Sequence, residues 1–423
     1  MAKIAIIGTG YVGLASAVGF AHLGHDVVGI DIDKEKITKL SRGKSPIYEK
    51  DMEVFLKKSL KKKKIKFSTD YSKVGSSKFV FLCLPTPQLE DGAADISFIL
   101  ESSKMLSRHL KKSSTVVIKS TVPVNTWKLV KEKIDRDDVA IVSNPEFLRE
   151  GTALQDFFKP DRIVVGSTDE VKAKEVSSLY KAKKAKIVFT DNTSAEIIKY
   201  ASNSFLAIKL SFVNEIAAYA ESTDANALEV LNAMGLDKRI GKDFLKPGPG
   251  WGGMCFPKDV SALKESARKK NVPIPLLDAA LESNLKAHAR IVEKCKKALG
   301  GTLKDKKISV WGLSFKANTD DTRFSPAISV IERLILEGAQ ISSFDPIVKS
   351  VENLSMKVSA DIKQNVTGAD AIVLLTEWQE FKEIDPKEIS DLVTQKIIID
   401  SRNLLNKNKW EKAGFTFIGN GYN

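Results

Sequence analysis

Cys255 and the residues that follow it are the part of this sequence best suited to covalent chemistry. Cys255 stands in the run GGMCFPKD, so that Lys258 and Asp259 come within four residues of the thiol. A nearby ammonium favours the thiolate, which is the nucleophilic form of cysteine. We therefore predict that Cys255 is a nucleophile. The alternative is a buried cysteine that only packs, which is how we interpret Cys83, in an apolar strand, and Cys295, on a helix.

Two other polar pairs have spacings that could support the same chemistry. Lys199 and Asn203 are four positions apart in a helical pattern, so they lie on one stripe of that helix. A lysine and an amide that converge on one point can stabilise an oxyanion, although an exposed helix surface would show the same spacing. Glu146 and Glu150 follow the predicted strand Ala140–Ser143, at the end where parallel sheets bind ligands. They would share a helix face if that segment is helical.

The run GTGYVG, from Gly8 to Gly13, predicts a binding site for a dinucleotide. It follows a short apolar strand and opens a helix, whose free N–H groups suit a pyrophosphate. Asp31 ends the next predicted strand, where a carboxylate accepts hydrogen bonds from ribose hydroxyls and repels a 2′-phosphate. This pattern favours NAD over NADP, although Lys34 and Lys36 weaken the preference slightly. The alternative is a tight turn that binds no ligand.

An α/β framework must position these residues. Short apolar runs alternate with helical patterns in the first part of the chain and again after Gly300, which is typical of parallel sheets covered by helices on both faces. We therefore predict an α/β protein with two doubly wound domains. The predicted strands are Ile4–Gly8, Asp26–Asp31, Phe79–Leu84, Thr115–Lys119, Ala140–Ser143, Arg162–Gly166 and Lys186–Phe189 in the first domain, and Lys307–Gly312, Gln340–Phe344, Ala371–Leu375 and Lys396–Ile399 in the second.

A long central helix is predicted over Ala195–Glu221, a stretch without glycine or proline. Its apolar residues recur every three or four positions, which predicts that one side of the helix is buried. These residues are Ile198, Ala201, Phe205, Ile208, Phe212 and Ile216. A second helix is predicted over Ile274–Leu299. We divide the chain into a cofactor domain at 1–194, a central helical domain with the Cys255 loop at 195–300, and a third domain at 301–423.

The composition excludes several other classes of protein. The chain has 423 residues, of which 43% are apolar, as expected of globular domains. No apolar run approaches the ~18 residues of a membrane span, and the first strand leaves no room for a signal peptide, so we expect a cytoplasmic protein. Three cysteines without CxxC spacing argue against disulfides and metal sites. The net charge of +13 is partly concentrated in Lys57–Lys66, which we interpret as a solvated helix end, an anion-binding patch being the alternative.

Seven segments, read in order along nearly the whole chain, resemble the UDP-glucose/GDP-mannose dehydrogenase family. They are GTGYVG at Gly8, STVPV at Ser120, NPEFLREG at Asn144, KYASNSFLAIKLSFVNE at Lys199, PGPGWGGMCFPKD at Pro247, FKANTDDTR at Phe315 and TEW at Thr376. Several motifs in register are far more specific than any one of them. The resemblance implies two Rossmann-like domains joined by a long central helix and a helical dimerisation domain.

The resemblance also implies an activity, the NAD-dependent oxidation of UDP-glucose to UDP-glucuronate. The C6 alcohol would be oxidised twice, through a thiohemiacetal and a thioester on Cys255, with two NAD⁺ reduced. Lys199 and Asn203 would stabilise oxyanions. Asp259, with Thr121 and Glu146, would position water and handle protons. A homodimer through the central helix is implied, in which Arg239 reaches the partner's site.

The resemblance assigns further residues to the two ligands. The residues implied to contact the cofactor are Gly8, Thr9, Gly10, Tyr11, Val12, Gly13, Asp31, Lys36, Thr86, Pro87, Thr121, Glu150, Lys258 and Arg323. The residues implied to contact the UDP-sugar are Phe147, Leu148, Arg149, Glu150, Lys199, Asn203, Arg239, Phe244, Leu245, Lys246, Pro247, Gly248, Gly252, Phe315, Lys316 and Arg402.

Other functions are less compatible with these motifs. Related enzymes that oxidise UDP-N-acetylmannosamine carry a histidine before the cysteine and lack the EFLREG and TEW patterns. GDP-mannose or another UDP-hexose is the alternative substrate, and Trp251 and Met254 depart from the family beside the nucleophile. A nucleotide sensor would not need Cys255 or Lys199. A nucleic-acid binder would have to use Lys57–Lys66, which lacks interleaved aromatic residues, so we expect no nucleic-acid partner.

Overall fold

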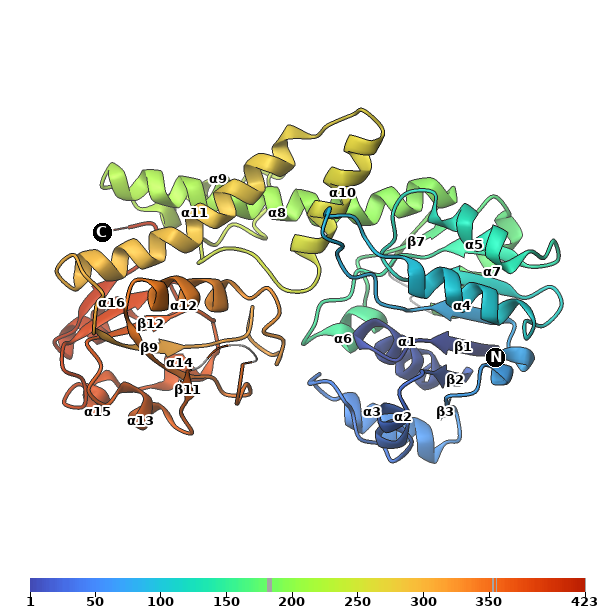
Figure 1. The fold of residues 1–423 in the computed structure, drawn as a ribbon, viewed down its shortest axis with the longest axis horizontal. Coiled ribbons are helices and arrows are strands. Elements are labelled where there is room, and N and C mark those ends of the chain that lie inside the picture. Colours follow the sequence, from blue (N-terminus) through green and yellow to red (C-terminus); the bar gives the residue numbers. More distant parts are fainter. Residues whose placement is uncertain (181–184, 352–353, 355, 423) are drawn as a thin grey trace. The chain divides into compact units, whose positions relative to one another are not determined.

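Two β-sheets organise the chain, each at the centre of its own unit (Figure 1). The structure is a computed structural model that describes residues 1–180, 185–351, 354 and 356–422. Unit 1 comprises Met1–Ser202 and Ser261–Val272, and unit 2 comprises Asn203–Val260 and Pro273–Asn423. Helices α8 (Asn192–Ser222) and α10 (Phe256–Lys269) contribute residues to both units.

Unit 1 contains an eight-stranded sheet in the order β3-β2-β1-β4-β5-β6-β7-β8. The strands are β1 (Lys3–Ile7), β2 (Asp26–Ile30), β3 (Ile65–Ser68), β4 (Phe79–Leu82), β5 (Thr115–Ile118), β6 (Ala140–Ser143), β7 (Arg162–Gly166) and β8 (Lys186–Thr190). Neighbouring strands are parallel except β6 and β7, which pair antiparallel at Ser143 and Gly166. The prediction of a parallel sheet is thus right for the first six strands, whereas β7 and β8 run in the opposite direction.

The central strands of unit 1 are buried on both faces, because successive side chains point to opposite sides of the sheet and both sides are packed, whereas the edge strand β8 is largely exposed. Ile4 and Ile6 of β1 belong to one core, and Ala5 and Ile7 belong to the other. The helices of the first core are α1 (Tyr11–His22), α2 (Lys34–Ser41), α3 (Met52–Lys61), α6 (Ala153–Phe158) and α7 (Glu170–Ser177), and those of the second are α4 (Ser97–Ser107) and α5 (Thr126–Ile134). Two short 3₁₀ helices, Tyr71–Ser76 and Ser178–Tyr180, complete the unit.

Unit 2 contains a six-stranded sheet in the order β11-β10-β9-β12-β13-β14, and every pair is parallel. The strands are β9 (Lys307–Trp311), β10 (Gln340–Phe344), β11 (Lys357–Val358), β12 (Ala371–Leu374), β13 (Ile397–Asp400) and β14 (Thr416–Ile418). Helices α11 (Pro275–Ala298) and α12 (Pro326–Leu336) pack on one face, and a core with Trp311, Trp378 and Trp410 fills the other. The remaining helices are α9 (Ala227–Met234), α13 (Ile362–Val366), α14 (Glu380–Glu383), α15 (Pro386–Ile389) and α16 (Lys407–Lys412).

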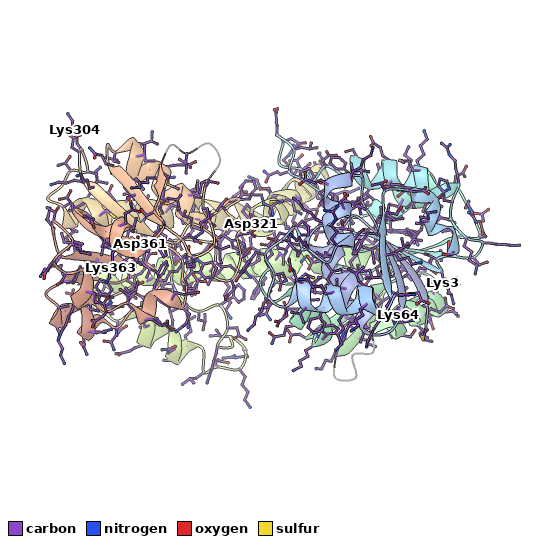
Figure 2. All side chains as sticks on the ribbon, turned by 90° about the horizontal axis from the view of Figure 1, so that it is seen from below. Lys3, Lys64, Lys304, Asp321, Asp361 and Lys363 are labelled. Atoms are coloured by element: carbon purple, nitrogen blue, oxygen red, sulfur yellow. The ribbon has the colours of Figure 1, made fainter. Side chains whose placement is uncertain are left out.

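The basic run Lys57–Lys66 covers more than a helix end. It comprises the last turns of α3, a turn, and the start of the edge strand β3, which the sequence did not predict. Lys57 pairs with Glu53, and Lys64 pairs with Asp26 (Lys64 is labelled in Figure 2). The exposed residues of the run are Lys57, Lys58, Lys61, Lys62, Lys63 and Lys66. The interpretation as a solvated helix end is therefore right only for its first half.

The central helix forms as predicted, but its apolar stripe is not buried within this chain. Phe205 is 65% exposed, Phe212 is 48% exposed and Tyr219 is 67% exposed. The buried side instead carries small and polar residues, including Lys199 and Asn203. The prediction of a buried apolar side is wrong, because apolar periodicity identifies an apolar face of the helix but does not show whether the same chain or another one buries that face. Across the described ranges, no helix combines the length and apolar character needed to cross a bilayer.

Candidate active site

The turn after β1 has the geometry of a phosphate-binding turn. Gly8 has a φ of +88°, and a Cβ there would stand 2.5 Å from the carbonyl oxygen of Cys83. A Cβ on Gly13 would stand 1.9 Å from the carbonyl oxygen of Gly8, so only glycine lets α1 begin so close to the turn. A Cβ on Gly10 would have no atom within 4 Å, and Gly10, the N-cap residue of α1, has no side chain with which to cap the helix. A phosphate therefore fits at this helix N-terminus.

Asp31, just after β2, faces the same turn. Its Oδ2 accepts hydrogen bonds from the backbone N and the hydroxyl of Thr9, at 2.9 and 2.8 Å, and pairs with Lys36 at 3.1 Å. Burial acts to raise the pKa of Asp31, but the hydrogen bonds from Thr9, Asp33 and Lys36 hold that pKa below its usual value. Asp31 therefore stays a carboxylate, the form that accepts bonds from ribose hydroxyls. Together with the open turn, this fits NAD.

A buried ion pair forms the second feature of unit 1. Lys199 on α8 pairs with Glu146 at 2.9 Å, and each side chain is 5% exposed. The Nζ atom of Lys199 also lies 5.4 Å from the ring centre of Phe147. Thr121 and Lys199 line a small cavity of about 10 Å³. The structure thus brings together three of the predicted catalytic residues, and it excludes the reading of Lys199 as an exposed helix residue.

The segment that carries Glu146 is not helical. Residues 144–150 form an irregular connection between β6 and α6, so the condition under which Glu146 and Glu150 would share a helix face is not met. Glu146 instead turns back, and its Oε2 accepts the N–H of Leu148.

The third feature, in unit 2, is the environment of Cys255. The thiol is half-buried and stands just before α10, and the backbone N of Asp259 donates to the carbonyl of Cys255 at 2.9 Å. Asp259 is 1% exposed, and its two oxygens contact Asn203 at 2.6 Å and Lys258 at 2.5 Å. The carboxylate, the amide and the ammonium thus form one hydrogen-bonded group, and Cys255 stands one helical turn before Asp259. Cys83 and Cys295 differ, because burial raises the pKa of each thiol to about 12, in agreement with a packing role.

Two asparagines, which the sequence analysis missed, hold the loop before Cys255. Asn284 on α11 accepts the N–H of Trp251 at 2.8 Å and donates to its carbonyl at 2.9 Å. Asn214 on α8 accepts the N–H of Gly248 at 2.9 Å, and the indole of Trp251 donates to Ser211 at 2.8 Å. Asparagines inside helical patterns give no signal in a single sequence, because a backbone partner far along the chain cannot be read from spacing.

Several residues predicted for the UDP-sugar meet at the carboxyl ends of the unit 2 strands. Arg402, after β13, donates to the carbonyls of Leu375 and Phe315, at 2.8 and 3.2 Å. A Cβ on Gly248 would stand 3.2 Å from Nη1 of Arg402. This edge of a parallel sheet is where ligands bind. The structure does not join Arg239 to this group, because its side chain is 89% exposed and pairs with Asp237.

Other predicted residues occupy mixed environments. Arg323 pairs with Asp321, labelled in Figure 2, at 2.6 Å. Thr86 is buried and donates to the carbonyl of Thr121 at 2.9 Å. Lys246 is exposed, whereas Pro247 and Gly248 are buried.

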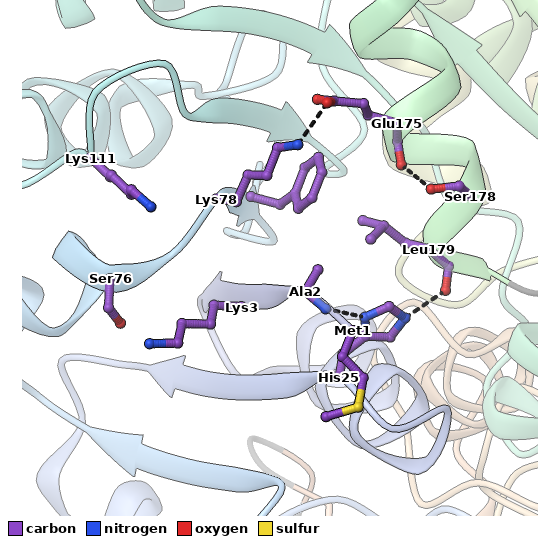
Figure 3. Close-up of a pocket in the computed structure, with 11 residues that line it drawn as sticks. Met1, Ala2, Lys3, His25, Ser76, Lys78, Lys111, Glu175, Ser178 and Leu179 are labelled. Atoms are coloured by element: carbon purple, nitrogen blue, oxygen red, sulfur yellow. Dashed lines mark hydrogen bonds and ion pairs between the residues drawn. The ribbon is translucent and has the colours of Figure 1, made fainter.

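A wider cavity, of about 480 Å³, lies at the opposite edge of the unit 1 sheet (Figure 3). It is lined by residues at the starts of β1 and β4, such as Lys3 and Lys78, whereas the cofactor turn follows the end of β1. The ammonium of Lys78 is engaged by Glu175 at 2.6 Å. Because parallel sheets bind ligands at their carboxyl ends, we do not place the active site there.

Comparison with known proteins agrees with this geometry. Residues 2–184 match the NAD-binding domain, residues 193–286 the central domain and residues 309–407 the UDP-binding domain of the UDP-glucose/GDP-mannose dehydrogenase family. A UDP-glucose 6-dehydrogenase of Rickettsia felis is 38% identical over 430 residues, which cover 99% of this chain and 96% of that protein. The chain therefore belongs to the UDP-glucose/GDP-mannose dehydrogenase family.

Solved structures show the same fold. A UDP-glucose dehydrogenase from the hyperthermophilic archaeon Pyrobaculum islandicum is similar with a TM-score of 0.92 and 33% identity, over 100% of this chain and 98% of that one. A UDP-D-ManNAc dehydrogenase from Pyrococcus horikoshii is similar with a TM-score of 0.89 and 29% identity, over 99% of both chains. The predictions of two Rossmann-like domains joined by a long helix, of NAD as cofactor and of an NAD-dependent oxidoreductase are confirmed.

Proposed function

We propose that this protein oxidises UDP-glucose to UDP-glucuronate in two NAD-dependent steps at C6 of the sugar. The observation that carries the proposal is a half-buried thiol, Cys255, one helical turn before a buried carboxylate, Asp259, that binds both Asn203 and Lys258. The names of its relatives, such as the UDP-glucose 6-dehydrogenase of Rickettsia felis, support the choice of sugar. The match to a UDP-binding domain at residues 309–407 supports the nucleotide.

The chain's own residues account for the chemistry at C6. Two molecules of NAD⁺, bound one after the other, would each accept one of the two hydrides that leave C6. In the first step the C6 hydroxyl loses its proton and a hydride and becomes an aldehyde. The thiolate of Cys255 then adds to the aldehyde carbon, and loss of the second hydride from this thiohemiacetal leaves a thioester. Water attacks the thioester carbonyl, the C–S bond breaks, and the acid and the Cys255 thiolate are released.

Two groups of side chains support these steps. Lys199 and Asn203, on successive turns of α8, stabilise the developing oxyanions as hydrogen-bond donors. Asp259, Glu146 and Thr121 position the water and move protons. That Lys199 and Asp259 are each held by a buried partner supports these roles, because fixed donors and acceptors need no rearrangement during the reaction.

The proposed binding residues divide between the two ligands, the cofactor and the UDP-sugar. We propose that Gly8 to Gly13, Asp31 and Lys36 hold NAD, with the other cofactor residues named above. Phe315, Lys316 and Arg402 with the Phe244–Gly248 segment hold the UDP-sugar. The meeting of Gly248, Phe315 and Arg402 at one sheet edge supports this assignment.

A homodimer through α8 is part of the proposal. The exposed side chains of Phe205, Phe212 and Tyr219 recur every seven residues, so they form one apolar stripe on α8. Such a stripe is unfavourable in water and suits a second copy of the same helix. The exposed Arg239 is free of the substrate edge in its own chain, which supports its proposed role in the partner's site. We retain 1–194, 195–300 and 301–423 as the cofactor, central and UDP-sugar domains.

The test is an assay of NADH formation with UDP-glucose, GDP-mannose, UDP-galactose and UDP-N-acetyl sugars. UDP-glucose should give about two NADH per sugar, because the same chain performs both oxidations. One NADH per sugar with free aldehyde as the final product would refute the covalent route. A clear preference for GDP-mannose would refute the choice of substrate while leaving the chemistry intact.

A further inference from the structure

Glu196 is a buried carboxylate that the proposed mechanism does not use. It lies on α8 one turn before Lys199 and is 3% exposed. Its Oε2 accepts the N–H of Asn125 at 2.7 Å, and its Oε1 accepts the N–H of Trp127 at 2.9 Å. One side chain of α8 thus supplies both acceptors at the start of another helix, α5.

The start of α5 depends on this distant cap. Asn125 precedes α5 in the left-handed region, with a φ of 69°, and its side chain does not cap the helix. Its Oδ1 instead accepts the hydroxyl of Thr193 at 3.1 Å, and that hydroxyl oxygen accepts the indole N–H of Trp127 at 3.1 Å. Helix starts need acceptors for their N–H groups, and here Glu196 provides them. The turn at 123–127 is therefore fastened to α8 by Glu196 and Thr193.

This turn adjoins the proposed catalytic residues of unit 1. Thr121 comes just before it, and Thr121, Glu196 and Lys199 line the same cavity of about 10 Å³, roughly the space of one water molecule. The carbonyl of Thr121 is also held by the hydroxyl of Thr86 at 2.9 Å. A shift of the turn would consequently move Thr121 relative to Lys199.

We propose that Glu196 is a positioning residue, which holds the turn at 123–127 and thereby keeps the adjoining Thr121 in place relative to Lys199. This inference rests on the roles proposed above for Thr121 and Lys199. In this role Glu196 acts through the backbone of residues 123–127 and touches neither substrate nor cofactor.

The position also makes the site sensitive to pH. Burial raises the pKa of Glu196 to about 8, against the opposing hydrogen bonds from Trp127 and Asn125. Asp191 raises this pKa further and Lys128 lowers it, while Lys199, paired with Glu146, faces the shared cavity. A protonated carboxyl turns one O–H toward an N–H donor and so offers one good acceptor where two are needed. The cap is therefore complete only above about pH 8.

The test is Glu196→Gln, which keeps the shape but replaces one acceptor with an NH₂ group. We expect kcat to fall about tenfold and the Kd of NAD⁺ to rise about fivefold, as expected for a small displacement and a lost cap. A rise of kcat through about pH 8 in the unmodified protein should be absent from the variant. The matched control is Asp169→Asn, because Asp169 accepts the N–H groups of Val171 and Lys172 at the exposed start of α7. It should keep the normal kcat, Kd and pH profile.

A second variant, Thr193→Val, loosens the same turn without altering the carboxylate. Thr193→Val should also lower kcat and raise the Kd of NAD⁺, while the rise of kcat near pH 8 is retained. If Glu196→Gln fails to fold, this variant alone tests whether the turn positions the site. Normal values in Glu196→Gln would overturn the proposal. So would a normal Thr193→Val beside an inactive Glu196→Gln, because Glu196 would then act on the chemistry directly. The NAD⁺ Kd does not depend on the covalent mechanism, so failure of the proposed function would be seen separately, as an active Cys255→Ser.

Discussion

The two sheets share a strand order and a glycine turn after their first strand, but the aspartate that follows the second strand differs between them in its burial and its partners. The first six strands of unit 1 and the six strands of unit 2 have corresponding orders, with the first strand third from the edge. Gly8 follows β1 with a φ of +88°, and Gly312 follows β9 with a φ of +90°. A Cβ on Gly312 would stand 2.3 Å from the Cβ of Thr376, so this turn is as tightly constrained as the one at Gly8.

The second strand of each sheet is followed by an aspartate that accepts an N–H from the turn. Asp31 accepts from Thr9 at 2.9 Å, and Asp345 accepts from Leu313 at 2.8 Å. Asp345 is fully buried, and its oxygens also accept the N–H groups of Ile347 and Val348 and the indole N–H of Trp378. Asp31 is only partly buried. The same fold position thus carries a partly exposed carboxylate in unit 1, where we propose that it binds a ligand, and a fully buried one in unit 2.

Trp378 accounts for the difference. Its side chain is 2% exposed and donates to Asp345 at 3.1 Å, on the carboxylate oxygen that also accepts from the turn. A ribose could not reach Asp345, because its carboxylate is fully buried, whereas Asp31, which also accepts several hydrogen bonds, remains partly exposed. The TEW motif therefore closes, in unit 2, the position that corresponds to the one beside Asp31 in unit 1.

The largest effect should come from Cys255→Ser, which separates the proposed covalent chemistry at Cys255 from cofactor binding in unit 1. A hydroxyl is a much poorer nucleophile than a thiolate, so turnover should fall by ~10³-fold or more, on the order of 4 kcal/mol of barrier. The Kd of NAD⁺ and the thermal midpoint should change little. The measurements are NADH formation, NAD⁺ titration and thermal melting.

Cys295→Ser is the matched control for that variant. The Cys295 thiol is fully buried and its pKa is raised to about 12, so it should be inert and the variant should remain active, with some loss of stability. If Cys255→Ser forms the sugar acid at a near-normal rate, the covalent route is wrong. If it loses activity only by unfolding, Cys255 has a packing role.

The next largest effect should come from Asp345→Ala, which tests whether Asp345 is a structural tie. Its removal leaves several buried N–H groups without their acceptor, at a cost of about 3 kcal/mol in the free energy of unfolding. Urea denaturation measures this loss. Trp378→Phe should cost less, because it removes one donor and leaves the backbone bonds in place. A fully stable Asp345→Ala would show that the comparison of the two aspartates is mistaken.

A buried histidine in each unit extends the comparison to pH. In unit 1 both ring nitrogens of His25 are engaged, by the N–H of Ala2 and the carbonyl of Leu179, each at 3.1 Å. In unit 2 neither ring nitrogen of His288 has a hydrogen-bond partner among the described residues. Burial, with a smaller effect of Arg333, lowers the pKa of His288 to about 4.

The sign of the resulting pH dependence follows from the lowered pKa. The unfolded chain binds a proton at His288 below about pH 6.5, whereas the folded chain binds it only near pH 4. The stability contributed by the neutral ring is therefore complete above pH 6.5 and lost as the pH falls through 4, by up to about 3 kcal/mol. Urea denaturation of His288→Phe should show a smaller loss over this range. The same loss in both proteins would assign the effect to other groups.

The sequence predicted the repeated elements well and the partners of buried polar groups poorly. Every predicted strand is present within two residues at each end. Most of them are buried on both faces, and such strands are recognisable as continuous apolar runs. The short strands β3, β11 and β14 were missed, and β3 begins inside the basic run. The Cys255 group could be anticipated from its motif. The roles of Asn284, Glu196 and Asp345 could not, because their partners lie far away in sequence and only the fold brings them together.

The smallest of these effects should come from Asp31→Ala, which tests the ligand side of the comparison. The variant removes the carboxylate that would hold the ribose hydroxyls and releases Lys36 from its ion pair. We expect the Kd of NAD⁺ to rise about tenfold, or 1.4 kcal/mol. The discrimination against NADP⁺ should fall, because the released ammonium of Lys36, and no longer a carboxylate, would lie beside the 2′ position.

Asp33→Asn is the matched control, since Asp33 caps α2 by accepting the N–H of Lys36 and should not affect the choice of cofactor. Fluorescence titration with both nucleotides measures the ratio, and the thermal midpoint should change far less than in Asp345→Ala. A native preference for NADP⁺, or an unchanged ratio in Asp31→Ala, would show that Asp31 is a structural tie like Asp345.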